Sequence, residues 1–290
     1  VKFEFIKANA AKYPTRVICK VMGVSSSAYY DWNKRPGKLI SANELALYRR
    51  CKALFHESRQ SLGSRQMMKK LCKEGFVVGR YKTSRIMAKL KLKVYQRQAY
   101  KVTTMRKHNH SVADNILDQQ FNQSQPNQVW AGDVTYLRTA EGWMYLAIVM
   151  DLYSRKIIGW SVNKRMTVSL VKKAMSMAIN TRQPCNELMF HSDRGSQYTS
   201  KDFQALLSNN SIVPSMSGKG ACWDNAVVER FFGSLKHEWL LNVYHITRDG
   251  MKQDVESYIK YYNQIRLHTA NGDQTPIEYE NSLRKVSGMS

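Results

Sequence analysis

Three carboxylates in the sequence, Asp133, Asp193 and Glu229, have the type and setting to bind metal ions. Asp133 lies in an alternating strand-like stretch, Asp193 follows an apolar strand-like run, and Glu229 lies in a helical repeat, with 59 and 35 residues separating them in order. Divalent hard cations prefer oxygen ligands. Two such cations about 3.5–4 Å apart activate an attacking oxygen and stabilise a leaving one in phosphodiester chemistry. The three acids therefore predict a two-metal site, provided that the fold brings them together.

Each acid also has a non-catalytic interpretation. Asp133 could lie at an exposed strand end, and Asp193 precedes Arg-Gly-Ser, which is typical of a turn aspartate. Glu229 and Lys236 could belong to a solvated helix face. Taken singly, the non-catalytic interpretation is favoured for Asp193 and Glu229, so the prediction depends on the combination.

The segment around Glu229 predicts a helix over residues 224–241, with Asp224 or Asn225 as its N-cap. Glu229 and Lys236 are seven residues apart, so a regular helix places them on one flank. That arrangement pairs a metal-binding acid with a phosphate-binding base. The predicted buried stripe consists of apolar residues at helical spacing: Val228, Phe232, Leu235 and Trp239.

Five motifs together resemble the bacterial insertion-sequence transposases of the orfB type, which have a retroviral-integrase-like catalytic core. Around the acids they read WAGDVTYL at Asp133, HSDRGSQYTS at Asp193 and DNAVVERFFGSLKHEWL at Glu229. MDLYSRKIIGW from Met150 and YYNQIRLHTANGDQTPIEYE from Tyr261 complete the match, which covers essentially the whole chain.

The resemblance implies a DDE transposase that cleaves DNA and transfers strands, integrating its element. It implies that Asp133, Asp193 and Glu229 are both catalytic and metal-binding, with two Mg²⁺ ions as cofactors that Mn²⁺ can replace. It also implies that the base seven residues after the glutamate, Lys236, contacts DNA.

Arg194 and Arg230, each next to one of the acids, are further candidates for DNA contact. The implied partners are double-stranded DNA of the element ends and target, further copies of the chain on paired ends, and a small upstream helix-turn-helix/zipper protein, made separately or as a fusion. No sustained heptad zipper occurs in this sequence itself.

The element order predicts an α/β catalytic core. Strands are expected at residues 128–138, 143–152, 156–162, 187–192 and 211–216, and helices at 168–181, 200–209, 224–241 and 251–264. This order matches a ribonuclease-H-like, mixed five-stranded sheet with flanking helices. The resemblance then makes the first and fourth strands neighbours, so that Asp133 and Asp193 meet.

Charge separates the chain into two regions. Residues 1–110 contain 26 Lys and Arg against 5 Asp and Glu, a net charge of +21 out of +23 for the chain. A basic region joined to a near-neutral one indicates a nucleic-acid-binding arm on a catalytic body. We therefore expect a helical DNA-binding region at residues 1–95 with two helix-turn-helix units, a basic and polar linker at 96–125, and the core with its C-terminal helix at 126–285.

The first helix-turn-helix is expected at residues 15–22 and 26–32, with a turn at Gly23, an N-cap at Ser25 and a small core of Ile18, Val21, Val24 and Tyr29. The second helix of such a motif enters a DNA major groove. This makes four residues on or after that helix candidates for DNA contact: Ser26, Tyr29, Lys34 and Arg35. The second unit is expected from helices at 42–57, 65–73 and 83–90.

Cysteine use and hydropathy bear on the compartment. The five cysteines contain no CxxC pair, and the seven histidines have no metal-finger spacing, which argues against disulfides and a structural zinc site. The sequence contains no run of about 18 apolar residues, so no membrane span is predicted. We expect a cytoplasmic, nucleoid-associated protein.

Three residues near the acids leave further alternatives. Asp151 is expected in a strand-end ion pair with Arg155 rather than as an accessory acid. His191 is expected to pack rather than to reach the site. Trp223 is equally consistent with stacking on a displaced base and with burial.

Two other function classes compete with the transposase. One is a DNA-binding regulator with an inactive core, which the intact set of acids disfavours. The other is a nuclease of the same fold that does not join strands, which would not require so basic an arm.

Overall fold

The computed structural model describes residues 1–34, 40–94, 113–184, 187–218, 222–241 and 243–287. The chain divides into two compact units, residues 1–53 and residues 54–290. Each unit is considered by itself. The predicted DNA contact Arg35 lies outside the described residues.

The N-terminal unit begins with three short helices, α1 (Lys2–Asn9), α2 (Thr15–Val21) and α3 (Ser26–Lys34). The turn between α2 and α3 uses Gly23 at φ 62°, a left-handed conformation that glycine adopts without strain. The side chain of Ser25 accepts a long bond from the Ala28 N–H at 3.5 Å, as expected of a cap.

The core of these helices differs in part from the prediction. Ile18 and Tyr29 are buried, but Val21 is 80 % exposed. Its expected place is taken by Ile6 of α1, a helix that the sequence did not predict. Tyr29 is only 3 % exposed, which does not favour the DNA contact expected of it.

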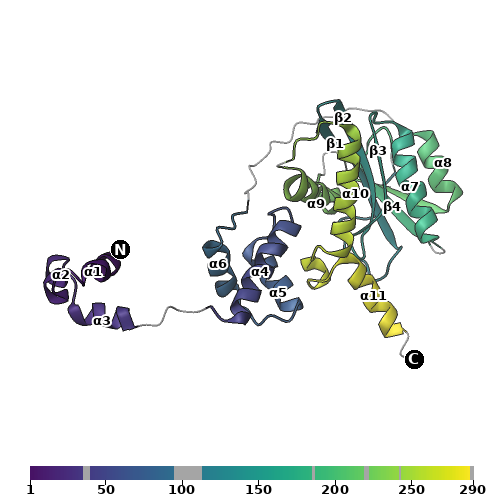
Figure 1. Cartoon of the computed structure of the whole chain (residues 1–290). Helices are drawn as coiled ribbons and strands as arrows, with labels where there is room; N and C mark the ends of the chain where they lie inside the picture. The colour runs from purple at the N-terminus through teal and green to yellow at the C-terminus, as the bar shows by residue number, and fades with distance from the viewer. Residues whose placement is uncertain (35–39, 95–112, 185–186, 219–221, 242, 288–290) are drawn as a thin grey trace. The chain divides into compact units, whose positions relative to one another are not determined.

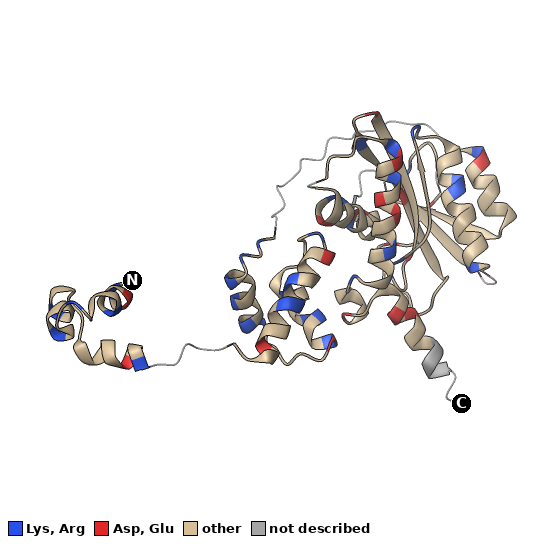
Figure 2. Cartoon of the chain, in the orientation of Figure 1, with Lys and Arg blue, Asp and Glu red and all other residues tan. Residues whose placement is uncertain are grey.

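Three helices follow: α4 (Ala42–Glu57), α5 (Ser64–Lys73) and α6 (Arg80–Lys89). Figure 2 shows Lys and Arg positions, in blue, along the ribbons of all three. α4 and α5 agree with the expected bounds to within one residue. α6 begins three residues before its expected start, because Gly79 provides the helix entry and the Thr83 hydroxyl bonds back to the Gly79 carbonyl within the first turn.

The catalytic region contains one mixed sheet of five strands in the order β3-β2-β1-β4-β5. The strands are β1 (Val129–Thr139), β2 (Gly142–Asp151), β3 (Lys156–Asn163), β4 (Leu188–Ser192) and β5 (Ile212–Met216). β1, β2 and β3 form an antiparallel meander, whereas β4 pairs in parallel with both β1 and β5. The ribonuclease-H-like order, with the first and fourth strands as neighbours, is confirmed.

Helices cover both faces of this sheet, as Figure 1 shows. α7 (Val168–Arg182) and α8 (Lys201–Asn209) pack on one face, over a cluster that includes Trp130, Val149 and Phe190. α9 (Ala226–Ser234) and α10 (Arg248–Gln264) cover the other face, over residues such as Ala131 and Ile148. Alternate residues of β1 therefore face opposite layers, as the period of two in its sequence predicts.

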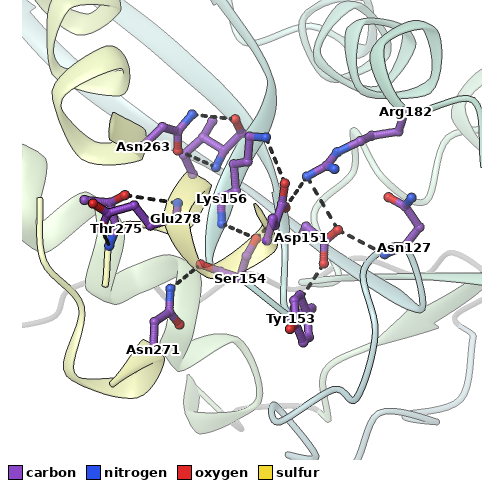
Figure 3. A network of polar contacts seen from close by, with 12 residues as sticks. Asn127, Asp151, Tyr153, Ser154, Lys156, Arg182, Asn263, Asn271, Thr275 and Glu278 are labelled. Carbon is purple, nitrogen blue, oxygen red and sulfur yellow. Dashed lines mark hydrogen bonds and ion pairs between the residues drawn. The ribbon is translucent and has the colours of Figure 1, made fainter. Parts of the chain in front are cut away.

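A buried polar network joins the end of β2 to the C-terminal region (Figure 3). Asp151 is fully buried and accepts hydrogen bonds from the Asn127 and Tyr153 N–H groups, both at 3.0 Å. Its ion-pair partner is Arg182 of α7, at 3.8 Å. The expected pair with Arg155 is wrong, because the Arg155 guanidinium donates instead to Asn122.

Glu280 completes the network from α11 (Pro276–Ser287), a helix that the sequence did not predict. Its carboxylate accepts bonds from Arg182 at 2.5 Å, Ser154 Oγ at 2.7 Å and Lys156 at 2.9 Å. Burial raises the pKa of Asp151 to about 6, against its N–H donors and Arg182. Burial also acts to raise the pKa of Glu280, but its three donors outweigh burial and hold that pKa below its ordinary value.

We predict that Glu280→Gln lowers the free energy of unfolding at pH 8 by about 3 kcal/mol, because it leaves the buried Arg182 without its closest carboxylate. The lowered pKa of Glu280 means that its contribution is present above the ordinary pKa and is lost as the pH falls through the folded-state value. Denaturant unfolding at pH 8 and pH 4 measures both effects. The exposed i,i+4 pair of Glu256 with Lys260 provides the control. Glu256→Gln should change stability by less than about 0.5 kcal/mol, and an equal effect of the two substitutions would contradict the network's importance.

Candidate active site

Asp133 and Asp193 lie just beyond the same end of the pairing between β1 and β4. The parallel pairing of β1 with β4 ends at Ala131 opposite His191, and each acid lies two residues beyond that pair. Because parallel strands run in the same direction, both acids lie just beyond the same end of this pairing, Asp193 after β4 has ended and Asp133 within β1, where it is still paired with β2. The pKa of buried Tyr198 is raised, first by burial and then by the negative charges of Asp133 and Asp193. The phenol therefore lies near both carboxylates.

Each of the two acids accepts a backbone hydrogen bond, and a glycine lies close to each in the sequence. The Val134 N–H donates to Asp133 Oδ1 at 2.7 Å, and the Gly195 N–H donates to Asp193 Oδ1 at 3.0 Å. A Cβ atom at Gly195 would lie 2.8 Å from Asp193 Oδ1 and would force the carboxylate to shift. A Cβ atom at Gly132 would lie 2.5 Å from the ring of Phe190. A larger residue at either position would displace its neighbour.

The Glu229 helix is attached to β1 beside Asp133. The Asn225 amide donates to the Gly132 carbonyl at 3.3 Å, one turn before Glu229. The predicted stripe of Val228, Phe232, Leu235 and Trp239 is buried, as expected. Glu229 lies on the exposed flank of α9, and partial burial raises its pKa. This flank leaves the carboxylate accessible to a ligand.

One of the two residues expected at the N-cap of this helix occupies that position, but without a side-chain capping bond. Asn225 is the N-cap residue, but neither its side chain nor that of Asp224 makes a capping bond to the helix. Asp224 instead accepts bonds from Asn115 at 2.9 Å, Gln119 at 3.0 Å and the Gly218 N–H at 2.8 Å. These three bonds join the start of the Glu229 helix to the segment that enters the core and to the end of β5.

His191 packs beneath this junction, as expected. It is fully buried, and its ring lies 2.9 Å from Ser215 Oγ and 3.2 Å from Ser217 Oγ. Burial lowers its pKa to about 4, opposed by the charge and backbone of Asp224. The ring is therefore neutral at pH 7 and serves as a polar link between β4 and β5.

The predicted helix over residues 224–241 has three segments: η1 (Cys222–Asn225), α9, and the π-helical turn η2 (Leu235–Leu240). Glu238 in this turn binds Arg266 through two bonds of 2.8 and 2.6 Å, which anchors it to the chain after α10. A π turn has a wider hydrogen-bond ring than an α-helix. The seven-residue spacing from Glu229 therefore does not by itself determine where Lys236 lies.

Lys236 reaches back toward β1. Its Nζ lies 4.7 Å from the centroid of the Tyr136 ring. Burial lowers the pKa of Lys236, while the charge of Asp133 acts in the opposite direction. The base is thus near Asp133 and lies over an aromatic ring on the same strand.

The oxygen donors present suit a hard divalent cation. Within the described part of the chain, however, no three His, Cys, Asp or Glu side chains are grouped closely enough to hold one ion together. The structure brings Asp133 and Asp193 together and places Glu229 on the adjoining helix, without completing a three-ligand cluster.

The other residues predicted to contact DNA differ in their solvent exposure. Arg194 is exposed and donates to the Ser217 carbonyl at 2.7 Å, and Arg230 is exposed on α9. Trp223 is 69 % exposed, which rules out its burial and leaves stacking open. Lys34 is exposed and Ser26 is partly exposed.

The sequence-based prediction overlooked Tyr198 and assigned Asp224 to the wrong task. Tyr198 lies five residues after Asp193 inside the HSDRGSQYTS motif, which was the available signal. For Asp224 no local signal indicated its partners, because Asn115 and Gln119 are more than 100 residues away.

Both the helical region and the sheet region match known protein families. Residues 123–222 and 210–276 match two models described as an integrase core domain, and residues 42–100 match an HTH-like domain. The chain is 37 % identical over 286 residues to the transposase InsF for insertion sequence IS3A of Escherichia coli K12, covering 97 % of this chain and 99 % of that protein. It is 35 % identical to the insertion element IS600 uncharacterized 31 kDa protein of Shigella sonnei, covering 93 % and 100 %.

Two solved structures resemble this chain at lower sequence identity. The magnesium complex of the HTLV-2 integrase catalytic core is 21 % identical with a TM-score of 0.43, covering 54 % of this chain and 98 % of that chain. A simian T-cell lymphotropic virus intasome bound to a PP2A regulatory subunit is 16 % identical with a TM-score of 0.48, covering 79 % and 74 %.

We predict that Asp224→Ala loosens the start of the Glu229 helix. It removes the acceptor for the half-buried Asn115 amide, the exposed Gln119 amide and the Gly218 N–H, so the free energy of unfolding should fall by about 1–3 kcal/mol. Hydrogen exchange should accelerate most at Gly218 and in the first turn of α9. Asp202→Ala, at an exposed acid in the first turn of α8, should leave both measurements unchanged. Uniform acceleration across the sheet would instead indicate general destabilisation.

Proposed function

Because the chain belongs to the family of insertion-sequence transposases that includes the IS3 proteins, we propose that Asp133, Asp193 and Glu229 form its catalytic centre. The observation that supports this most directly is that Asp133 and Asp193 each lie two residues beyond the end of the parallel β1–β4 pairing, with the Glu229 helix bonded to β1 beside them. The protein is a DDE transposase that cleaves DNA and transfers strands. The assignment of these roles to the three residues is the proposal.

We propose that the three carboxylates hold two Mg²⁺ ions and that Mn²⁺ can replace them. When bound, such ions supply Lewis-acid stabilisation to the attacking and leaving oxygens of a phosphodiester. The supporting observation is the donor set, which consists of carboxylate oxygens and fits hard cations. Glu229 is the ligand that must approach the other two, and the accessible flank of α9 on which it lies permits this.

The reaction has two phosphoryl transfers. Water first attacks a phosphodiester at the element end, the bond to the leaving 3′ oxygen breaks, and that oxygen takes up a proton as a 3′ hydroxyl. The 3′ hydroxyl then attacks a phosphodiester of the target, loses its proton and releases a second 3′ hydroxyl. We propose that Lys236 binds a phosphate next to the scissile bond, because its ammonium lies near Asp133. Arg194 and Arg230 are proposed to contact the flanking DNA.

The proposed division of labour along the chain follows its charge. Residues 1–95 bind the element ends, residues 96–125 link this region to the core, and residues 126–285 perform the chemistry. Ser26, Lys34 and Arg35 are proposed DNA contacts, and the net charge of +21 in residues 1–110 supports this placement. Buried Tyr29 is better explained as a core residue of its helix pair.

We further propose that the protein acts as a homo-multimer on paired DNA ends. Joining two ends to one target requires two active centres in one complex. We also propose that an upstream small helix-turn-helix/zipper protein contributes, either separately or as a fusion. The proposed location is the bacterial cytoplasm, on the nucleoid. Among the described residues no helix has the length and apolar character needed to cross a membrane.

We predict that Asp133→Asn, Asp193→Asn and Glu229→Gln each abolish strand transfer while retaining binding of element ends, since each removes a charged ligand but little volume. The assay uses a labelled oligonucleotide with the element's own end, Mg²⁺ and a target duplex. Asp249→Asn, at an exposed acid in the first turn of α10, is the matched control and should retain full activity.

Different outcomes separate the competing interpretations. Cleavage without joining, even with the upstream protein added, would indicate a nuclease. Tight end binding by the wild type with neither product would indicate a regulator. Full activity of any one acid variant would remove that residue from the proposed centre.

We predict that removing divalent metal with EDTA stops both cleavage and joining, and that Mg²⁺ or Mn²⁺ restores them. End binding by the basic arm should persist in EDTA. A Hill analysis of the Mg²⁺ dependence tests for more than one ion. Unchanged cleavage in EDTA, after confirmed metal removal, would exclude the proposed metal chemistry.

A further inference from the structure

Two aromatic rings are exposed side by side on the β1–β2 hairpin. Tyr136 is 55 % exposed and Trp143 is 49 % exposed, and their ring centroids lie 5.5 Å apart at an interplanar angle of 86°. Neither ring belongs to the hydrophobic clusters found among the described residues. Large aromatic rings left in water next to each other are typical of a binding surface.

The strand register places cations on the same face as these rings. Arg138 is directly opposite Trp143, and Tyr136 is two residues from Arg138, so all three side chains project from one face of the hairpin. The Arg138 guanidinium lies 6.0 Å from the centroid of Trp143, and the Lys236 ammonium lies 4.7 Å from that of Tyr136. Aromatic rings flanked by cations are the combination by which proteins bind unpaired nucleic acid, with bases on the rings and phosphates on the cations.

This aromatic face adjoins the candidate active site. Tyr136 lies three residues beyond Asp133 on β1, about 10 Å along the strand, and its side chain projects from the opposite face of β1. Lys236, which follows the Glu229 helix, also reaches this face, because its ammonium lies 4.7 Å from the centroid of the Tyr136 ring. A DNA strand whose phosphate is bound at Asp133 thus reaches the aromatic face by passing around the edge of β1 beyond Ala131, where the pairing with β4 has ended.

We infer that Tyr136, Arg138 and Trp143 form a binding site for unpaired bases next to the scissile phosphate. The inference rests on the proposed position of cleavage at Asp133. Lys236 already covers Tyr136, so Trp143 provides the open ring on which a base stacks, and Arg138 binds the adjoining phosphate. Duplex DNA cannot use such a ring, because its bases are stacked on each other. The two flanking cations favour a polyanion over the apolar surface of another protein as the occupant.

The test compares DNA binding by the full-length wild type, Trp143→Leu and Trp143→Phe. The probes are an element-end duplex that is blunt and the same duplex with a three-nucleotide unpaired extension at the cleaved end. Binding is measured by fluorescence anisotropy in EDTA, so that the result does not depend on catalysis or metal. Circular dichroism melting confirms that each variant folds.

We expect the wild type to prefer the extended duplex, and Trp143→Leu to lose about tenfold in affinity for it, in line with ~1–3 kcal/mol for stacking of one base. Binding of the blunt duplex should stay unchanged, and Trp143→Phe should retain most of the preference because it keeps a ring. Arg138→Gln should weaken binding of the extended duplex and reduce its salt dependence.

Three results would overturn the inference. Equal losses on both probes would show general DNA contact without base stacking. Unchanged binding of both probes by Trp143→Leu would remove the site. If Trp143→Leu binds both DNA probes as the wild type does but forms a smaller assembly in sedimentation, the aromatic face is an interface between copies of the chain. If Trp143→Leu abolishes the preference for the extended duplex but the wild type shows no strand transfer, the binding site is retained and only the proposed chemistry is rejected.

Discussion

The short parallel pairing between β1 and β4 is the contact on which the candidate site depends. It comprises only three residue pairs, from Val129 with Met189 to Ala131 with His191. The two strands are separated in sequence by the meander and by α7, so the pairing closes a long loop and draws its stability from burial on both faces. Trp130 and Phe190 pack on one face and Ala131 on the other. Asp133 and Asp193 meet because the strands that precede them are held in this way.

The negative charges of Asp133 and Asp193 repel each other, and neighbouring groups must offset this repulsion. Like charges at close range disfavour each other's ionised form, and here the buried Tyr198 lies near both. The opposing contributions are local: the Val134 N–H bonds Asp133, the Gly195 N–H bonds Asp193, and the Lys236 ammonium is near Asp133. A divalent cation would offset the repulsion more strongly than these groups can. The strands thus place two carboxylates where a cation can bind. The hydrophobic core around the strands supplies the free energy of folding that offsets the repulsion between them.

Sequence patterns predicted the sheet well, because alternation and apolar runs are local properties that burial preserves. All five strands lie within one residue of their expected bounds, and the buried stripe of the Glu229 helix was correct. The failures share a different cause. Asp224 and Asn225 have the right types for a helix cap, yet each side chain bonds to a partner distant in sequence. Asp151 likewise selects Arg182 over the nearby Arg155. Where a polar side chain has a buried partner from another element, nearness in sequence is a poor guide.

The Glu229 helix shows why predicting the residues of a site is easier than predicting its geometry. Its seven-residue spacing to Lys236 assumes one regular helix, whereas the chain changes to a π turn after Ser234. That turn is held by the two bonds from Arg266 to Glu238, and Tyr258 of α10 lies 3.4 Å from the same carboxylate. The end of the helix is therefore set by α10 and its continuation, while its beginning is set by the Asp224 junction. Glu229 lies between two tertiary anchors, and its distance from Asp133 and Asp193 follows from both.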